Sequence, residues 1–157
     1  VNETTIASPG INAKMNEVQS AYGLLQLKYI DEYTAKRKEI SDLYRKKLAG
    51  IKGIRFLSDI KGLEHSYTYF PILVNEDEYI ESRDALYERL KSHNIIGRRY
   101  FYPLISQFPT YKALPSAKSE NLPIATKVAE QIICLPLYPS LSDDTINLIS
   151  LIIASVE

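Results

Sequence analysis

The sequence is poor in the residue types from which most catalytic and metal sites are built. Its 157 residues include one cysteine, two histidines and no tryptophan. A single cysteine excludes a disulfide within the chain, which is compatible with a reducing cytoplasm, where we expect the protein to act. Cys134 lies in the apolar run QIICLPL, so we interpret it as a small core residue and not as a nucleophile. With so few histidines and thiols, no metal site is predicted.

The sequence also lacks an excess of charge and a long apolar run. Nineteen basic and nineteen acidic residues cancel, so the net charge gives no reason to expect nucleic acid or an anionic membrane as a partner. The basic runs KRK and RKK between residues 36 and 47 are interleaved with acidic residues, which favours a solvated helix face. No apolar run approaches the roughly 18 residues that span a bilayer, so no membrane partner is predicted.

Common catalytic motifs are absent as well. The chain has no G-x-S-x-G, no Walker A loop, no G-x-G-x-x-G and no H-E-x-x-H. We therefore predict no catalytic residue in this chain, and a domain that completes a site held elsewhere. The chain opens on Val1 without an initiator methionine, and we expect it to be part of a longer protein.

What is present is the pattern of an α+β domain. Asn16 is a candidate N-cap for a helix whose stripe Val18, Tyr22, Leu25 predicts a buried face. Gly23 inside this helix lowers its stability or lets another backbone approach closely. The charged stretch that follows, to about residue 48, continues this helix or forms a second one after a bend.

The remaining pattern predicts a small sheet of three or four strands with helices on one face, in one domain over 1–157. Pro71 suggests that its strand lies at an edge or carries a bulge. The predicted strands cover 54–57, 67–74, 95–102 and 133–137, and the predicted helices cover 82–94, about 124–132 and 142–153.

The stretch GINAK at 10–14 is a candidate anion site. The amide of Asn12 and the ammonium of Lys14 stand just before a helix, whose first turn has free backbone N–H groups. The alternative is a hydrogen-bonded lead-in loop with no ligand.

The run RRYFYPL is a second candidate. Arg98 next to Tyr100 and Tyr102 could present a guanidinium and ring faces to a sugar or nucleotide, and in a strand all three would share one face. An aromatic strand with only a structural role remains the alternative. The ring-rich run HSYTYFP could equally be core.

The order of motifs resembles one protein family. GINAKMNEVQSAYGLLQL resembles the motif G-x-N-x-[RK]-[ML]-x-E-x-Q-A-A-x-G-L-x-Q-L of the DegT/DnrJ/EryC1/StrS family of PLP-dependent sugar aminotransferases. Three later segments resemble further family segments in the same order, so that the likeness covers essentially the whole chain. They are HSYTYFPILV, DALYERLKSHNIIGRRYFYPLISQFPTYK and ENLPIATKVAEQIICLPLYPSLSDDTINLI.

The resemblance implies the small C-terminal domain of a fold type I aminotransferase, with its lead-in loop and long helix and a mostly antiparallel sheet. The large domain, with pyridoxal 5'-phosphate (PLP) and its Schiff-base lysine, would be missing from this chain. The intact enzyme would be a homodimer that transfers an amino group, with glutamate as the donor, to a nucleotide-linked keto-sugar. Such a reaction serves amino-sugar or surface polysaccharide biosynthesis, and the fragment alone would be inactive.

The family motif also assigns roles to residues. Asn12 would contact the PLP phosphate of the other subunit, and Lys14 would approach the substrate's phosphates where many relatives have arginine. Tyr100 stands at a position that is often histidine, so we predict Arg98, Tyr100 and Tyr102 as the substrate contacts here.

Other functions remain open at this stage. The chain could be a stand-alone module that binds a nucleotide-sugar or a protein without catalysis, or a family member that has become a regulator. The small domain of another fold type I enzyme, such as a desulfurase, would need a reactive cysteine, which Cys134 in an apolar run does not supply.

Overall fold

The computed structural model describes residues 13–156. The chain divides into two compact units, residues 1–32 and residues 33–157. The first holds α1 (Glu17–Leu27) and the start of α2 (Ile30–Leu48), and the second holds the sheet and the other helices. No helix in the described part of the chain is long and apolar enough to cross a membrane.

Helix α1 begins where the sequence predicts. The Asn16 side chain accepts a hydrogen bond from the Gln19 backbone N–H at 2.8 Å, and the Gln19 side chain accepts one from the Asn16 N–H at 3.2 Å. This reciprocal pair is a capping box. The chain then bends at residues 28–29, so the alternative with two helices is confirmed. The predicted buried face is wrong, because α1 has no buried residue.

The sheet has three antiparallel strands in the order β1–β2–β3. They are β1 (Ile54–Phe56), β2 (Phe70–Val74) and β3 (Ile132–Leu135). The α+β class with a small antiparallel sheet is therefore confirmed. Strand β2 starts later than predicted because Tyr67 has a φ of 48°, in the left-handed region, which an extended strand excludes.

Pro71 lies in the central strand, so its predicted edge position is wrong. It pairs with Cys134, whose own N–H and C=O are engaged with Arg98 on the far side of β3. Pro71 and Cys134 are thus a non-hydrogen-bonded pair of the antiparallel ladder. An N–H group at position 71, which proline lacks, would point away from β3. On that side β1 already ends at Phe56, opposite Ile72. The proline therefore removes no ladder hydrogen bond.

The predicted strand over 95–102 is also wrong. Only Arg98 joins the sheet, through one bridge to Cys134. The chain turns directly afterwards, with the Tyr102 N–H donating to the Arg99 carbonyl at 3.0 Å. Gly97 lies against β3 so closely that an added Cβ would stand 2.8 Å from Ile133 Cδ1. Residues 95–102 therefore pair with β3 only at Arg98, and the chain then turns away from the sheet.

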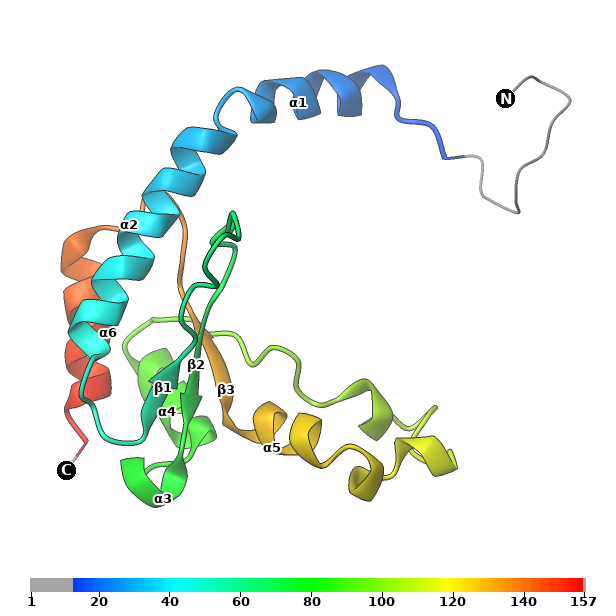
Figure 1. Cartoon of the computed structure of the whole chain (residues 1–157), viewed down its shortest axis with the longest axis vertical. Coiled ribbons are helices and arrows are strands. Elements are labelled where there is room, and N and C mark those ends of the chain that lie inside the picture. Colours follow the sequence, from blue (N-terminus) through cyan, green and yellow to red (C-terminus); the bar gives the residue numbers. More distant parts are fainter. Residues whose placement is uncertain (1–12, 157) are drawn as a thin grey trace, which may run out of the picture. The chain divides into compact units, whose positions relative to one another are not determined.

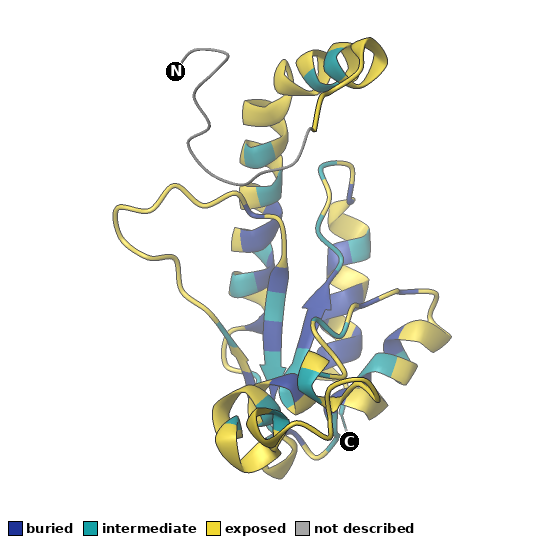
Figure 2. Ribbon diagram, turned by 90° about the vertical axis from the view of Figure 1, so that its right-hand side faces the viewer, coloured by how far each residue is buried: buried dark blue, intermediate teal, exposed yellow. Residues whose placement is uncertain are grey.

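The core lies on one face of the sheet. Phe70, Ile72 and Val74 of β2 are buried and point to this face, since alternate residues share a face. Helices α2, α4 (Arg83–Ser92) and α6 (Asp143–Ala154) cover it, and the buried residues gather between them and the strands (Figure 2). Their core residues are Ile40, Tyr44, Leu48, Leu86, Leu90, Ile146, Ile149, Ile152 and Ile153.

The other face of the sheet is only partly covered. Helix α5 (Pro123–Gln131) lies on the opposite side of the sheet from α2 and α6 (Figure 1). Its residues Lys127 and Gln131 share a small pocket with Arg55 and Leu73 of the strands. A helix on this face was not predicted. The connections contain the short helix α3 (Glu76–Tyr79) and the 3₁₀ turns Ile105–Gln107, Pro115–Ala117 and Ser119–Asn121.

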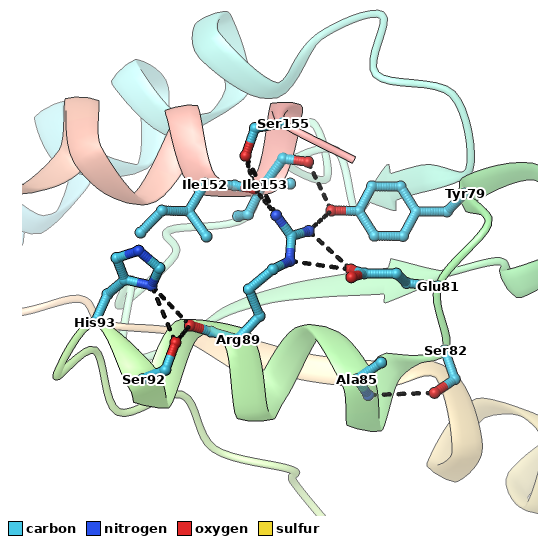
Figure 3. A network of polar contacts seen from close by, with 10 residues as sticks. All are labelled: Tyr79, Glu81, Ser82, Ala85, Arg89, Ser92, His93, Ile152, Ile153 and Ser155. Carbon is cyan, nitrogen blue, oxygen red and sulfur yellow. Dashed lines mark hydrogen bonds and ion pairs between the residues drawn. The ribbon is translucent and has the colours of Figure 1, made fainter. Parts of the chain in front are cut away.

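The last carbonyl groups of α6 accept hydrogen bonds from a polar network centred on Arg89 of α4 (Figure 3). Arg89 donates to the Ile152 carbonyl, to Glu81 at 2.8 Å and to the Tyr79 hydroxyl at 3.0 Å. Tyr79 in turn donates to the Ile153 carbonyl at 2.6 Å. A cation and a hydroxyl thereby satisfy carbonyls that a helix end leaves without partners. Burial raises the pKa of Tyr79 to about 12.

Candidate functional site

The candidate site lies on the sheet face that points away from the helical core. Pro71 pairs with Cys134, and Cys134 pairs with Arg98, so these three residues form a row across the sheet. Cross-strand partners place their side chains on the same face. Tyr69 is two residues before Pro71 and is 45% exposed, whereas its neighbour Phe70 is buried in the core. The alternation of β2 thus directs Tyr69 to the face that carries Arg98.

A pocket of about 450 Å³ opens on this face. It combines ring, aliphatic and guanidinium surface, as sites for small molecules often do. Its lining includes Tyr69, Ile96, Arg98, Cys134, Pro136 and Tyr138.

Tyr69, Arg98 and Tyr100 form the chemical centre of this face, which we call the Arg98 cluster. The rings of Tyr69 and Tyr100 have centroids 5.0 Å apart. The pKa of Tyr100 is lowered, chiefly by the Tyr69 hydroxyl donating toward it and next by the Arg98 guanidinium. The pKa of Tyr69 is raised mainly by the same contact. Among residues 13–156, no carboxylate lies within ion-pair distance of Arg98. An exposed guanidinium in this position can bind an anion.

Tyr102 does not join the Arg98 cluster. The turn after Arg98 carries it to α4, where the Arg83 guanidinium lies 4.5 Å from its ring centroid and that of Arg99 lies 5.4 Å away. The prediction that Arg98, Tyr100 and Tyr102 share one strand face is therefore wrong. The tyrosine nevertheless keeps 42% of its surface exposed.

Arg83 and Arg99 have structural partners that Arg98 lacks. Arg83 is buried and donates to the carbonyls of Ala129 at 2.8 Å and Ile132 at 2.9 Å. Both guanidiniums donate to Asp84, from Arg83 at 2.7 Å and from Arg99 at 2.8 Å. Partial burial of Asp84 opposes its ionisation, but the hydrogen bonds and charges of the two arginines outweigh it and lower its pKa. Arg83 therefore links α4 to α5, and Arg99 links α4 to the turn that follows Arg98.

Sequence reasoning missed Tyr69 and Arg83. The run HSYTYFP is ring-rich, and the alternation of the strand places Tyr69 on the face opposite to the buried Phe70. Arg83 stands in the first turn of a helix, where nothing in the sequence distinguishes a buried arginine from a solvated one.

The structure does not test the contacts predicted for Asn12 and Lys14 near the N-terminus. Asn12 lies outside the described residues. Lys14 is described and exposed, and it precedes α1 in the first unit. The Asn16 side chain already accepts one of the first-turn N–H groups of α1. The proposed phosphate contacts of Asn12 and Lys14 stay predictions.

The lysines of the described residues have surroundings unlike those of a Schiff-base lysine. A Schiff-base lysine works as a neutral amine, which proteins obtain by burying it or by placing it near other cations. Each lysine between residues 13 and 156 is exposed. The free Cys134 is buried, and burial raises its pKa, which disfavours the thiolate form that a nucleophile needs. No group of three metal-ligating side chains occurs within the described part of the chain.

Comparison with known proteins places these features in one family. The DegT/DnrJ/EryC1/StrS aminotransferase family matches residues 1–154. A protein of Escherichia coli named dTDP-4-amino-4,6-dideoxy-D-glucose transaminase is 47% identical over 92% of this chain and 39% of its own length. A protein of the same name from Shigella dysenteriae is 39% identical over 95% of this chain and 40% of its own.

Solved structures agree with this assignment. DesI, crystallised in the presence of its TDP-sugar product, superposes with a TM-score of 0.84 at 26% identity, over 92% of this chain and 36% of DesI. The chain thus spans about 40% of the length of the curated relatives it matches. From its motifs, its fold and these matches, the chain belongs to the DegT/DnrJ/EryC1/StrS aminotransferase family.

Proposed function

We propose that this chain is the small C-terminal domain of a PLP-dependent enzyme that transfers an amino group from glutamate to a nucleotide-linked keto-sugar. The observation that carries the proposal is the 47% identity with the E. coli transaminase over 92% of the chain. Because that relative is named for a 4-amino-4,6-dideoxy sugar on dTDP, the expected substrate is a dTDP-linked 4-keto-6-deoxyhexose. The product would enter amino-sugar or surface polysaccharide biosynthesis.

In this proposal the Arg98 cluster binds the sugar nucleotide. The Arg98 guanidinium, which has no carboxylate partner in the described chain, pairs with the diphosphate, and the rings of Tyr69 and Tyr100 pack on the base or sugar. Tyr102 contacts the substrate with the exposed face of its ring, because the Arg83 guanidinium lies over the other face. Lys14 contacts the substrate's phosphates as a point charge, and Asn12 contacts the cofactor phosphate across a homodimer.

PLP, when bound, supplies the electron sink for amino transfer. We place it in a large domain that this chain does not span, because the exposed lysines described above offer it no site. The isolated chain should therefore show no transaminase activity and no absorbance of lysine-bound PLP when the two are mixed. Stoichiometric PLP uptake that is lost when a lysine of this chain is replaced would contradict this part of the proposal.

A chimera tests the function itself. The matching part of the E. coli relative is replaced by this chain, and amino transfer from glutamate to the dTDP-linked keto-sugar is measured. We expect activity in the chimera, and a KM raised about tenfold or more with little change in kcat when Arg98 is replaced by alanine. Arg55→Ala is the matched control, since Arg55 is an exposed arginine on the same sheet face. An inactive but folded chimera that binds PLP would contradict the proposal.

A second function has one observation in its favour. The pocket beside Arg98 combines aromatic, aliphatic and guanidinium surface, which is the surface that a module binding nucleotide-sugars without catalysis would need. Calorimetry with dTDP separates the two: micromolar affinity of the isolated chain supports the module, and weak or absent binding supports the enzyme fragment.

A further inference from the structure

The turn that carries Tyr100 has few backbone contacts. Before it, Arg98 is fixed to β3, because the Arg98 N–H donates to the Cys134 carbonyl at 3.0 Å and the Cys134 N–H donates to the Arg98 carbonyl at 2.8 Å. Beyond Arg98, the turn forms one backbone hydrogen bond within the described chain, from the Tyr102 N–H to the Arg99 carbonyl. This bond closes the turn but does not attach it to another element. The position of Tyr100 therefore depends on side-chain contacts.

Asp84 makes the contact that attaches this turn to α4. One oxygen of its carboxylate, Oδ1, accepts a hydrogen bond from Arg99 Nη1 at 2.8 Å. The same oxygen accepts one from Arg83 Nε at 2.7 Å. The side chain of Arg83 is 1% exposed, and its Nη1 donates to the carbonyls of Ala129 and Ile132. Asp84 thus connects the arginine of the turn to an arginine that is fixed in the protein interior.

Two tyrosine rings reinforce this attachment. The Arg99 guanidinium lies 4.4 Å from the ring centroid of Tyr87 and 5.4 Å from that of Tyr102. Tyr87 lies on α4, one turn after Asp84. The Arg83 guanidinium lies 4.5 Å from the ring centroid of Tyr102. These distances are those of cation–π contacts. Arg99 and Tyr102, which the backbone hydrogen bond of the turn joins, are therefore both held beside α4.

The attachment fixes the two residues that the turn region supplies to the Arg98 cluster. Tyr100 follows Arg99 directly, and its ring centroid lies 5.0 Å from that of Tyr69. Arg98 precedes Arg99 directly and lines the pocket on the same face. The two cluster residues thus flank the arginine that Asp84 holds. Fixing them before a ligand arrives reduces the conformational entropy that is lost on binding.

We propose that Asp84 is a positioning residue for the sugar-nucleotide site. It joins Arg99 to the buried Arg83, and the turn then presents Arg98 and Tyr100 in the arrangement that the ligand meets. Asp84 does not itself touch the ligand. The proposal rests on the proposed function in that the Arg98 cluster binds the sugar nucleotide. Loss of the carboxylate should weaken that binding and leave the rate of amino transfer unchanged.

Two other roles for Asp84 predict different results. If Asp84 acted only through its charge, its removal would take a negative charge from the surroundings of an anion site and would lower KM. If it only stabilised the fold, its removal would reduce the melting temperature and the fraction of active protein, and would leave KM unchanged. A raised KM with kcat preserved is specific to the positioning role.

The chimera with the E. coli relative distinguishes these roles. Asp84→Asn should raise KM for the dTDP-linked keto-sugar about fivefold or more and change kcat by less than about twofold. Glu88→Gln is the matched control and should leave KM unchanged. It removes an exposed carboxylate one turn further along α4, where the partner is Lys91 at 3.4 Å. Arg99→Ala should reproduce the effect of Asp84→Asn, and Arg99→Lys, which keeps a cation beside Asp84, should restore most of the affinity.

A double variant tests whether the two residues act through one contact. Asp84→Asn combined with Arg99→Ala should raise KM no further than either change alone. Trypsin gives a readout that needs neither ligand nor activity, because it cleaves after arginine and can bind Arg99 only when that side chain leaves Asp84. Asp84→Asn should be cleaved after Arg99 at least about fivefold faster than wild type, and Glu88→Gln at the wild-type rate.

Four results would overturn the inference. They are a KM at or below the wild-type value in Asp84→Asn while Arg98→Ala raises KM, an equal rise in Glu88→Gln, additive effects in the double variant, and equal rates of trypsin cleavage in Asp84→Asn and wild type. A folded chimera without amino transfer refutes the proposed function instead. The dissociation constant of dTDP, measured by calorimetry on that chimera, then replaces KM with the same expected ratios. A chimera that does not bind dTDP overturns the inference as well.

Discussion

Helices α1 and α6 begin in the same way and have opposite surroundings. Each follows a side-chain cap, with Asn16 accepting from the Gln19 N–H at 2.8 Å and Ser142 accepting from the Thr145 N–H at 3.3 Å. Each is rich in apolar residues and close in length, 11 residues in α1 and 12 in α6. Ile146 and Ile149 of α6 are fully buried, whereas α1 buries nothing. The comparison shows that local signals define where a helix forms, and that burial depends on what the rest of the fold places beside it.

The C-terminal ends of α1 and α6 also differ in what satisfies their last carbonyl groups. The last carbonyls of α6 are satisfied by Arg89 and Tyr79 from distant parts of the chain. The end of α1 relies on its own backbone, with the Lys28 N–H donating to the Leu25 carbonyl at 3.2 Å. A helix held only by local bonds is marginal in water, so we expect α1 to depend on a partner and α6 to be stable within this chain.

The largest expected effect comes from a cavity in α6. Ile149→Ala should lower the free energy of unfolding by about 4 kcal/mol, because Ile149 is fully buried in the core. Leu25→Ala in α1, where the leucine is 46% exposed, should change it by less than about 0.5 kcal/mol. Urea unfolding of the chain measures both. Similar losses for the two variants would mean that α1 is already packed within the chain.

Replacing the buried Arg83 should lower the free energy of unfolding slightly less than Ile149→Ala does. Arg83→Met deletes donors to two buried carbonyls and to Asp84, and we expect a loss of about 3 kcal/mol. Arg55→Met is the control, because Arg55 is exposed and pairs with Glu78 only at 3.4 Å. If the two variants unfold at the same urea concentration, Arg83 does not link α4 to α5 as described.

Two glycines should respond in opposite directions. Gly53 has a φ of +79°, and an added Cβ would lie 2.5 Å from the Tyr79 backbone nitrogen, so Gly53→Ala should lower stability by about 2 kcal/mol. Gly23→Ala meets open space and should stabilise α1 by up to about 1 kcal/mol. Circular dichroism of the isolated chain should show more helix for Gly23→Ala. A loss of helix would show that Gly23 already contacts another backbone in this chain.

The smallest effect is a pH dependence at the loop before β2. Hydrogen bonds from Tyr67 and then Arg45 lower the pKa of Asp59. A carboxyl whose pKa is lower in the folded state stabilises it above the unfolded pKa, about 3.9, and loses that stabilisation as pH falls through the folded pKa. Unfolding free energies between about pH 5 and pH 2 should therefore fall more steeply in wild type than in Asp59→Asn. The difference should be small, since the Asp59 side chain is 35% exposed. Parallel pH profiles would refute the role of Asp59.

The parts of the fold predicted well are those that local chemistry specifies. Ser82 and Ser142 cap helices because a serine hydroxyl can accept from the third residue of the helix. The strands near 54, 70 and 133 follow from β-branched and aromatic runs. Of the three predicted substrate contacts, Arg98 lines the pocket and Tyr100 stacks beside Tyr69, whereas Tyr102 packs against Arg83. The error came from treating 95–102 as a strand, because pattern alone does not show that a partner strand touches only Arg98.

By itself, the sequence determined the helix starts, the approximate strands and the family motif, because caps and periodicity act over a few neighbouring positions. Only the tertiary structure decided that Pro71 is tolerated in the central strand, that Arg83 is buried while Arg98 is not, and that α1 is bare while α6 is covered. These outcomes depend on which segments distant in sequence meet, and a hydrogen-bond partner or a packed side chain exists only after they have met.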